Sequence, residues 1–423
     1  MYWAACWCAQ GSSRSDPTNE DGVTRPATPA PGSWLPLVVT LAIQAMVAMA
    51  LITLPVMAPQ VAAALSVSPA LLGVYVSATY LGATLASLMG GVAVTRWGAI
   101  RVSQSGLAIC ATGLILSATG WLPVMLPAAL LIGLGYGPIT PASSHVLART
   151  TPAHRMSLVF SIKQTGVPAG FMLGGAIVPS LMLMTGWQAS LVIVAVACLL
   201  CALASQPLQV GFDADRNPGQ TVRLSSLMEP IRLVLAYRSL TTMAACSFLF
   251  CIVQMSLTTY LVTFLHTDMA YGLVAAGLVL SFSQMGGVAG RIIWGYAADR
   301  WLGAFRTLVM LAGLMALCAL TTALFTPQVP RAVVIAVLVV FGASAIGWNG
   351  VYLAEVARRA PPGQASLATG GTLAFTFMGG LVGPSVFGGL SSWFGAYRAG
   401  YLALMAIAVT SGALLLWNHR RGR

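Results

Sequence analysis

The chain contains a single lysine, Lys163, in the segment SIKQTG, and its other twenty cationic side chains are all arginines. The flanking residues are apolar enough to lie in a membrane span. An ammonium group at the centre of a span costs about 2.5–3.5 kcal/mol, so it normally faces the protein interior and has a partner. No aspartate or glutamate occurs between Asp21 and Asp213. We therefore expect Lys163 to bind an anion that is not part of its own half of the chain.

Lys163 has an alternative role, which the sequence leaves open. It lies six residues past Ser157, about 9 Å into its span at 1.5 Å per residue. The flexible stem could follow the helix and place the ammonium among the cytoplasmic headgroups. The adjoining Gln164 and Thr165 extend the polar stretch, which favours a lined cavity.

A second cation, Arg291, precedes Gly295 by four residues and Asp299 by eight. Counted from the end of its span, it lies at a depth similar to that of Lys163. Its planar guanidinium can donate to both oxygens of a carboxylate. The alternative is a structural arginine that caps helix carbonyls or pairs with Asp299. Two cations without a nearby acid would form an electropositive site, for which the natural ligand is an anion.

Polar and aromatic residues in neighbouring spans are weaker candidates for the lining of this site. Trp348 and Asn349 interrupt an apolar run beside two glycines, a pattern typical of discontinuous membrane helices. Each candidate could instead hydrogen-bond between helices. The remaining lining candidates are Gln164, Gln254 and Tyr260.

His145 is the only histidine well inside a predicted span and is our candidate for proton coupling. It lies one turn before Arg149, where a structural hydrogen bond is the alternative.

Motifs for enzyme chemistry are absent from the sequence. The sole lysine lies in SIKQTG, so no phosphate-binding G-x-x-x-x-G-K-[ST] loop exists. Neither H-E-x-x-H nor a metal-binding Cys/His spacing occurs, and the interior histidine lacks the partners of a catalytic triad. We expect no enzyme activity, no cofactor and no metal site.

Composition indicates the elements that must position these residues. Of 423 residues, 58% are apolar and 7% charged, and the mean hydropathy is +0.85, which a water-soluble fold cannot reach. Helices cross a bilayer with about 20 apolar residues, and the strict alternation of a membrane barrel is absent. The predicted fold class is all-α integral membrane. The twelve predicted spans are 34–58, 70–94, 102–120, 123–147, 157–184, 187–205, 241–265, 271–296, 306–326, 331–353, 366–391 and 397–417.

The arginines predict the orientation of the chain. Seventeen fall in segments on the same side as the N-terminus, and only Arg331 and Arg398 fall on the other side. Basic residues near span ends stay in the cytoplasm, so both termini should be cytoplasmic. This bias also accounts for most of the formal charge of +12, so no nucleic-acid partner is expected.

The composition also divides the chain into five parts. The first part is rich in Ser, Pro, Thr and Gly and cannot bury enough surface to fold. The expected parts are a disordered tail 1–33, a bundle 34–205, a cytoplasmic linker 206–240, a second bundle 241–417 and a basic tail 418–423.

The two bundles are parallel repeats. The segment ARTTPAHRMSL from Ala148 matches ARRAPPGQASL from Ala357 at an offset of 209, and Gly186 then lies over Gly395. The segment GVAVTR from Gly91 matches GYAADR at an offset of 204.

This second match resembles the signature of the major facilitator superfamily, G-x-x-x-D-R-x-G followed by basic residues between the second and third helices. The later copy keeps Gly295, Asp299 and Arg300, followed by Gly303. The resemblance implies twelve helices in two six-helix bundles that rock about a central site.

The earlier copy of the signature keeps Gly91, Arg96 and Gly98, but Thr95 replaces its acid. We expect the residues of both copies to act in gating.

Spans five and eleven carry the Gly-Pro-Gly pattern of the family in GVPAGFMLGG and GGLVGPSVFGG, where small residues let helices approach closely.

The pattern R-x-x-x-G-x-x-x-D that begins at Arg291 resembles the eighth helix of monocarboxylate and oxalate transporters of this superfamily. In those proteins the arginine binds a substrate carboxylate. The resemblance implies a monomeric secondary active transporter of a small organic anion in the bacterial inner membrane. The expected partners are that anion, the lipid bilayer and protons, through proton-coupled uptake or anion exchange.

Two alternatives remain at this point. Efflux of hydrophobic drugs or metabolites is the first, although cationic drugs need a buried carboxylate that the first bundle lacks. A non-transporting sensor on the same fold is the second, and it would need an output domain that we do not find in the sequence.

Overall fold

A computed structural model of the protein describes residues 34–68, 70–151, 159, 162–219, 228–361 and 365–421. The tail 1–33 and residues 220–227 of the predicted linker lie outside the described residues. Within the described ranges the chain forms helices and no strands. The long helices are α1 (Leu35–Val56), α3 (Leu71–Trp97), α4 (Ala99–Ala118), α5 (Leu122–Tyr136), α8 (Gly166–Thr185), α9 (Trp187–Ala204), α12 (Arg238–Thr267), α13 (Leu273–Ala297), α14 (Ala304–Ala323), α15 (Arg331–Gly347), α17 (Ala365–Trp393) and α18 (Tyr397–Arg421). The short helices are α2 (Ala58–Leu65), α6 (Ile139–Thr150), α10 (Gln209–Phe212), α11 (Glu229–Ala236) and α16 (Asn349–Arg359).

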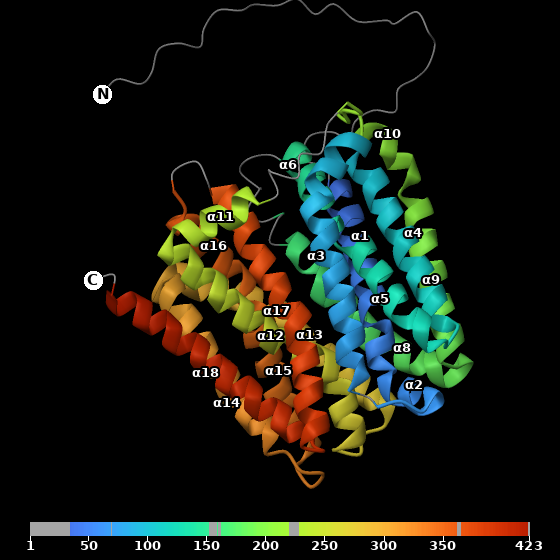
Figure 1. The fold of residues 1–423 in the computed structure, drawn as a ribbon, viewed down its shortest axis with the longest axis vertical. Helices are drawn as coiled ribbons and strands as arrows, with labels where there is room; N and C mark the ends of the chain where they lie inside the picture. Colours follow the sequence, from blue (N-terminus) through green and yellow to red (C-terminus); the bar gives the residue numbers. More distant parts are fainter. Residues whose placement is uncertain are drawn as a thin grey trace, which may run out of the picture.

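The helices confirm the predicted membrane fold. Eleven spans of the described chain are long and apolar enough to cross a bilayer, and α3 adds a twelfth if its two parts, bent by 55°, count as one. Every predicted span overlaps one of these helices. The helices form two bundles, one from α1 to α9 and one from α12 to α18 (Figure 1). We call the side of the bundles that carries α10 and α11 the linker side, and the side that carries α2 the opposite side.

Equivalent glycines turn the chain in the two repeats. Gly98 between α3 and α4 has φ +97°, and Gly303 before α14 has φ +75°. Gly186 and Gly395 are also in this left-handed region, with φ +86° and +65°. Side chains other than glycine rarely adopt such angles. The repeat found in the sequence therefore coincides with a repeat in the backbone.

The two bundles touch along the small-residue stretches of α8 and α17. Helix α8 packs on α13, and α17 packs on α3. A Cβ atom on Gly175 would lie 2.7 Å from the carbonyl oxygen of Gly277, so only glycine permits this approach. Ser281 Oγ also donates to the carbonyl of Met172 across the same seam, at 2.8 Å.

Candidate functional site

Lys163 lies in the helical turn 162–164 that precedes α8, and only 2% of its surface is exposed. Its ammonium Nζ donates to the backbone carbonyl of Thr140 at 3.1 Å and to Ser144 Oγ at 2.9 Å. Both acceptors belong to α6, so the ammonium points into the bundle and not toward the membrane surface. None of the ion pairs between described residues includes Lys163. In the described part of the chain, neutral oxygens alone hold this charge.

Arg291 reaches from α13 in the second bundle to the first bundle. Its Nη1 donates to the backbone carbonyl of Gln164, and its Nε donates to the carbonyl of Ile346 at 3.3 Å. Gln164 directly follows Lys163, so Arg291 contacts the backbone beside the lysine. Asp299 is exposed and is absent from the ion pairs between described residues. The pairing of Arg291 with Asp299 is therefore not observed there.

Interrupted helices supply the carbonyls that hold Arg291. Thr165 separates the turn 162–164 from α8, and Trp348 separates α15 from α16, as the glycine-flanked pattern predicted. The last carbonyls of a helix lack an intrahelical donor and carry the negative end of the helix dipole. Gln164 and Ile346 lie at two such ends, and Asn349 Nδ2 also donates to Ile346, at 3.3 Å. The positive charge of Arg291 is stabilised without being neutralised.

Gln44 on α1 belongs to this neighbourhood, and the sequence reasoning missed it. Its Oε1 accepts from Thr140 Oγ1 at the long distance of 3.5 Å, and a Cβ atom on Gly166 would lie 2.9 Å from its side chain. Its Nε2 is buried and has no hydrogen-bond partner. A buried donor without a partner is costly, and this one lies beside the residues that contact Lys163. The available signal was that Gln44 is the only amide side chain in α1.

Gln254 and Trp348 form a polar contact inside the second bundle. Trp348 Nε1 donates to Gln254 Oε1 at 3.1 Å. The indole packs edge-on against Phe250 and Tyr352, with ring centroids 5.5 and 5.2 Å away. Trp348 has no exposed surface and Gln254 is 6% exposed. In this conformation the pair joins α12 to the interruption between α15 and α16, next to the carbonyl that holds Arg291.

Tyr260 lies away from the cations, toward the opposite side. Its hydroxyl donates to the carbonyl of Ala70 at the start of α3, at 3.1 Å, and its ring stacks on Phe387 of α17 at 4.9 Å. Because Ala70 belongs to the first bundle and Tyr260 to the second, this contact joins the bundles on the opposite side. The structure does not bring Tyr260 together with Lys163 and Arg291.

The earlier copy of the signature lacks its acid, but the linker places a different acid, Asp213, beside the same loop. Thr95 Oγ1 donates to Gly91 at 3.1 Å, and the linker residue Asn217 donates its N–H to Thr95 at 2.7 Å. Asp213 caps α4 by accepting from the N–H groups of Ile100 and Arg101 at 2.8 and 3.0 Å. Burial raises the pKa of Asp213, and the two backbone donors oppose this rise. The linker thus packs against the loop that carries the signature.

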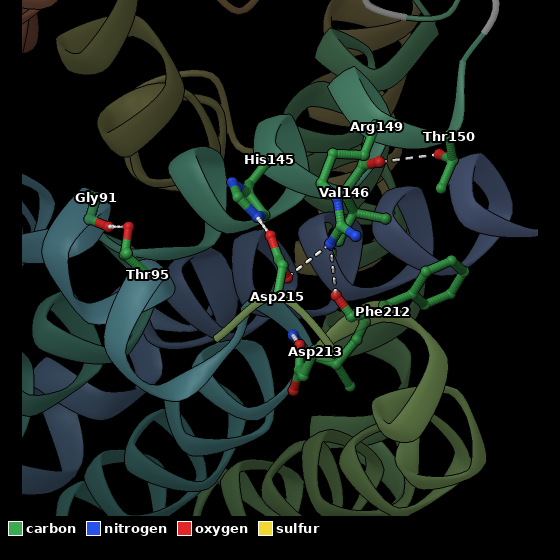
Figure 2. Close-up of polar contacts among 10 residues, drawn as sticks. Gly91, Thr95, His145, Val146, Arg149, Thr150, Phe212, Asp213 and Asp215 are labelled. Carbon is green, nitrogen blue, oxygen red and sulfur yellow. Dashed lines mark hydrogen bonds and ion pairs between the residues drawn. The ribbon is translucent and has the colours of Figure 1, made fainter. Parts of the chain in front are cut away.

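A second linker acid, Asp215, binds the linker-side end of α6 (Figure 2). Asp215 accepts from His145 Nε2 at 2.7 Å and pairs with Arg149 Nη1 at 2.6 Å. His145 is therefore in a partly exposed cluster with the linker and not among the residues around Lys163. Nothing in the sequence spacing connects Asp215 to His145, since 70 residues separate them.

The later copy of the signature is more open. Asp299 and Arg300 lie in a π-helical turn, Ala298–Leu302, and both are exposed. In the earlier copy Arg96 lies over the ring of Trp97 at 5.5 Å and is also exposed. A Cβ atom on Gly91 or Gly295 would meet nothing within 4 Å.

No group of three His, Cys, Asp or Glu side chains that could hold a metal occurs in the described ranges.

The model of the Major Facilitator Superfamily matches residues 39–384 of this sequence. The chain belongs to the Major Facilitator Superfamily. Its fold resembles the crystal structure of the nucleoside transporter NupG (D323A mutant), with a TM-score of 0.74 at 16% identity over 90% of this chain and 99% of the other. Members of this family are membrane transporters and not enzymes, which confirms the predicted family and class.

The relatives of this superfamily member include carboxylate transporters. The benzoate transport protein of Acinetobacter baylyi is 24% identical over 324 residues, which cover 69% of this chain and 68% of the relative. Monocarboxylate transporter 11 of Homo sapiens is 25% identical over 348 residues, 78% of this chain and 70% of the relative. For three other relatives the chain spans only about half of their length, between 44% and 58%. The chain is a multi-pass membrane protein of this superfamily.

Proposed function

We propose that the protein is a secondary active transporter of a small organic anion of the carboxylate class. The observation that carries this proposal is that Arg291 of the second bundle donates to the backbone carbonyl of Gln164, the residue that directly follows Lys163 in the first bundle. Both cations are held by neutral oxygens. The sequence has no aspartate or glutamate between Asp21 and Asp213, so the spans of the first bundle contain no carboxylate that could neutralise Lys163. A carboxylate that entered between the bundles would supply the missing negative charge.

The chemistry of the donors favours a carboxylate over a neutral substrate. Arg291 offers a planar fork of N–H groups and Lys163 a compact point charge, and both bind oxyanions. The buried Nε2 of Gln44 would add a neutral donor from α1. The names of the benzoate and monocarboxylate relatives support this substrate class. Gln164, Gln254, Trp348 and Asn349 are further proposed lining residues, and Tyr260 joins the site only if its contact to Ala70 opens.

Alternating access would follow from the bundle interface. Substrate would bind Arg291 in exchange for the carbonyl of Gln164, which removes a bond between the bundles and lets them rock. The copies of the signature at Gly91–Gly98 and Gly295–Arg300 would set the balance of the two access states. The linker side is proposed to be cytoplasmic, in a bacterial inner membrane. Because the interior potential opposes the entry of an anion, uptake would need an accompanying proton or exchange against another anion.

Thermal unfolding of the purified protein tests the substrate class. A ligand present at about 100 times its Kd stabilises the folded state by about 2.7 kcal/mol. We expect benzoate or short aliphatic carboxylates to raise the melting temperature, and the K163M variant to lose that rise. The matched control is R306Q, which removes an exposed arginine of α14. Stabilisation only by nucleosides, sugars or cationic drugs, with no effect of carboxylates, would refute the proposal.

A further inference from the structure

His266 joins the two bundles on the opposite side of the molecule. It is the penultimate residue of α12, and its Nδ1 contacts the carbonyl of Tyr271 at 2.8 Å. Its Nε2 contacts the side-chain Nε2 of Gln60, on α2 of the first bundle, at 3.2 Å. The contact therefore joins α2 of the first bundle to α12 of the second.

The hydrogen-bond partners fix the form of the neutral ring. A carbonyl oxygen only accepts, so Nδ1 carries the hydrogen and donates to Tyr271. Nε2 is then the acceptor, and the amide of Gln60 donates to it. The other atom of that amide, Oε1 of Gln60, is buried without a hydrogen-bond partner.

A proton that adds to Nε2 would make both ring nitrogens donors. The N–H of Gln60 would then face another N–H, but rotation of the amide brings Oε1 to the ring. That rotation gives a charge-assisted N–H···O bond, which is stronger than the neutral bond it replaces. Gln60 thus already holds an unused acceptor for the protonated ring.

The charges near His266 are few. Helix α2 carries no ionisable residue. Beyond the ring, Asp268 is exposed and accepts from Thr267 Oγ1 at 3.0 Å. Arg331 of α15 lies over the ring of Tyr271 at 5.5 Å. Tyr397 and Tyr401 of α18 are close enough to Asp268 to interact with its charge. Of the groups around the ring that are named here, only Gln60 belongs to the first bundle.

We propose that His266 is the binding site of the coupling proton and that Gln60 makes the affinity of this site depend on the access state. This inference rests on the proposed proton-coupled uptake and replaces His145 as the candidate. The closed state of the opposite side binds the proton more tightly, because only there does Gln60 meet the ring. By linkage, protons favour closure of that side. A proton loaded from outside would therefore help to close the transporter behind its substrate.

The test measures closure without any substrate, so it is independent of the proposed anion. Nitroxide labels are attached through unnatural amino acids at Leu122, the first residue of α5, and at Leu324, which directly follows α14. Both residues are exposed. Pulsed electron paramagnetic resonance then gives the distance between the bundles in lipid nanodiscs from pH 8 to pH 5.5. In the unmodified site we expect acid to raise the ratio of closed to open protein roughly fivefold or more, the lower end of usual coupling.

Three variants decide the assignment. H266N keeps a donor for Tyr271 and removes the titrating nitrogen, and Q60L keeps the histidine and removes its partner. Both should abolish the response to pH while melting temperatures show that they remain folded. H145N is the matched control, since it removes a histidine on the linker side, and it should respond normally. A response that persists in H266N, that is lost in H145N, or that is absent from the unmodified protein would overturn the proposal.

Discussion

Removal of both cations in a double-mutant cycle tests whether Lys163 and Arg291 share one anion. In K163M and R291M each side chain keeps most of its volume and loses its charge. Each cation now makes two hydrogen bonds to neutral oxygens, and a bound carboxylate would exchange one of them for a charge-assisted bond. Such a bond contributes about 1.5–3 kcal/mol. Each single variant should therefore weaken the affinity for a carboxylate about 10- to 150-fold.

The double variant should be less damaged than the sum of the singles. Arg291 donates to the carbonyl next to Lys163, so an anion that loses one cation can move toward the other. Residues that share a partner give an interaction energy of about 0.5–3 kcal/mol, whereas independent sites add to within about 0.3–0.5 kcal/mol. Titration calorimetry with the best carboxylate of the thermal screen measures all four affinities.

R306Q serves as the control for a general loss of positive charge, and its affinity should equal that of the unmodified protein. Strict additivity would separate the two cations and leave Arg291 as a structural arginine that caps the ends of broken helices. Unchanged affinity in K163M would remove Lys163 from the site altogether.

Three further changes test the parts of the structure that surround the site. D213A should lower the free energy of unfolding by about 0.5–2 kcal/mol, because α4 loses its N-cap. Chemical unfolding measures this change, and an unchanged free energy of unfolding would contradict the capping role. G277V should abolish uptake in proteoliposomes while carboxylate binding persists. The valine side chain would meet the backbone of Gly175 and keep the bundles apart. Normal uptake would show that the close contact of α8 with α13 is not needed for transport. D299N should slow turnover with little change in affinity, whereas a parallel loss of both would argue against a gating role.

The sequence predicted the spans well because a bilayer imposes its length on every helix. The interruption at Trp348 followed from its flanking glycines. Each of these features is local, so neighbouring residues are enough to reveal it.

Partners between distant segments could not be predicted in this way. The sequence showed that Lys163 has no acid nearby, but not that Thr140 and Ser144 hold it. It also offered no reason to connect Gln60 with His266, which are 206 residues apart. Their side chains meet only because α2 and α12 pack at the same end of the bundle interface.

The acids that complete the first signature copy come from outside the first repeat. Asp213 and Asp215 follow the last span of the first bundle, yet they bind α4 and α6 within it. The linker is therefore part of the structure of the first half, and the two halves cannot be exchanged at the end of the sixth span. A chimera that exchanged residues 34–205 alone would leave the capping carboxylates behind with the wrong partner, so the natural boundary for grafting this half lies beyond Asn217.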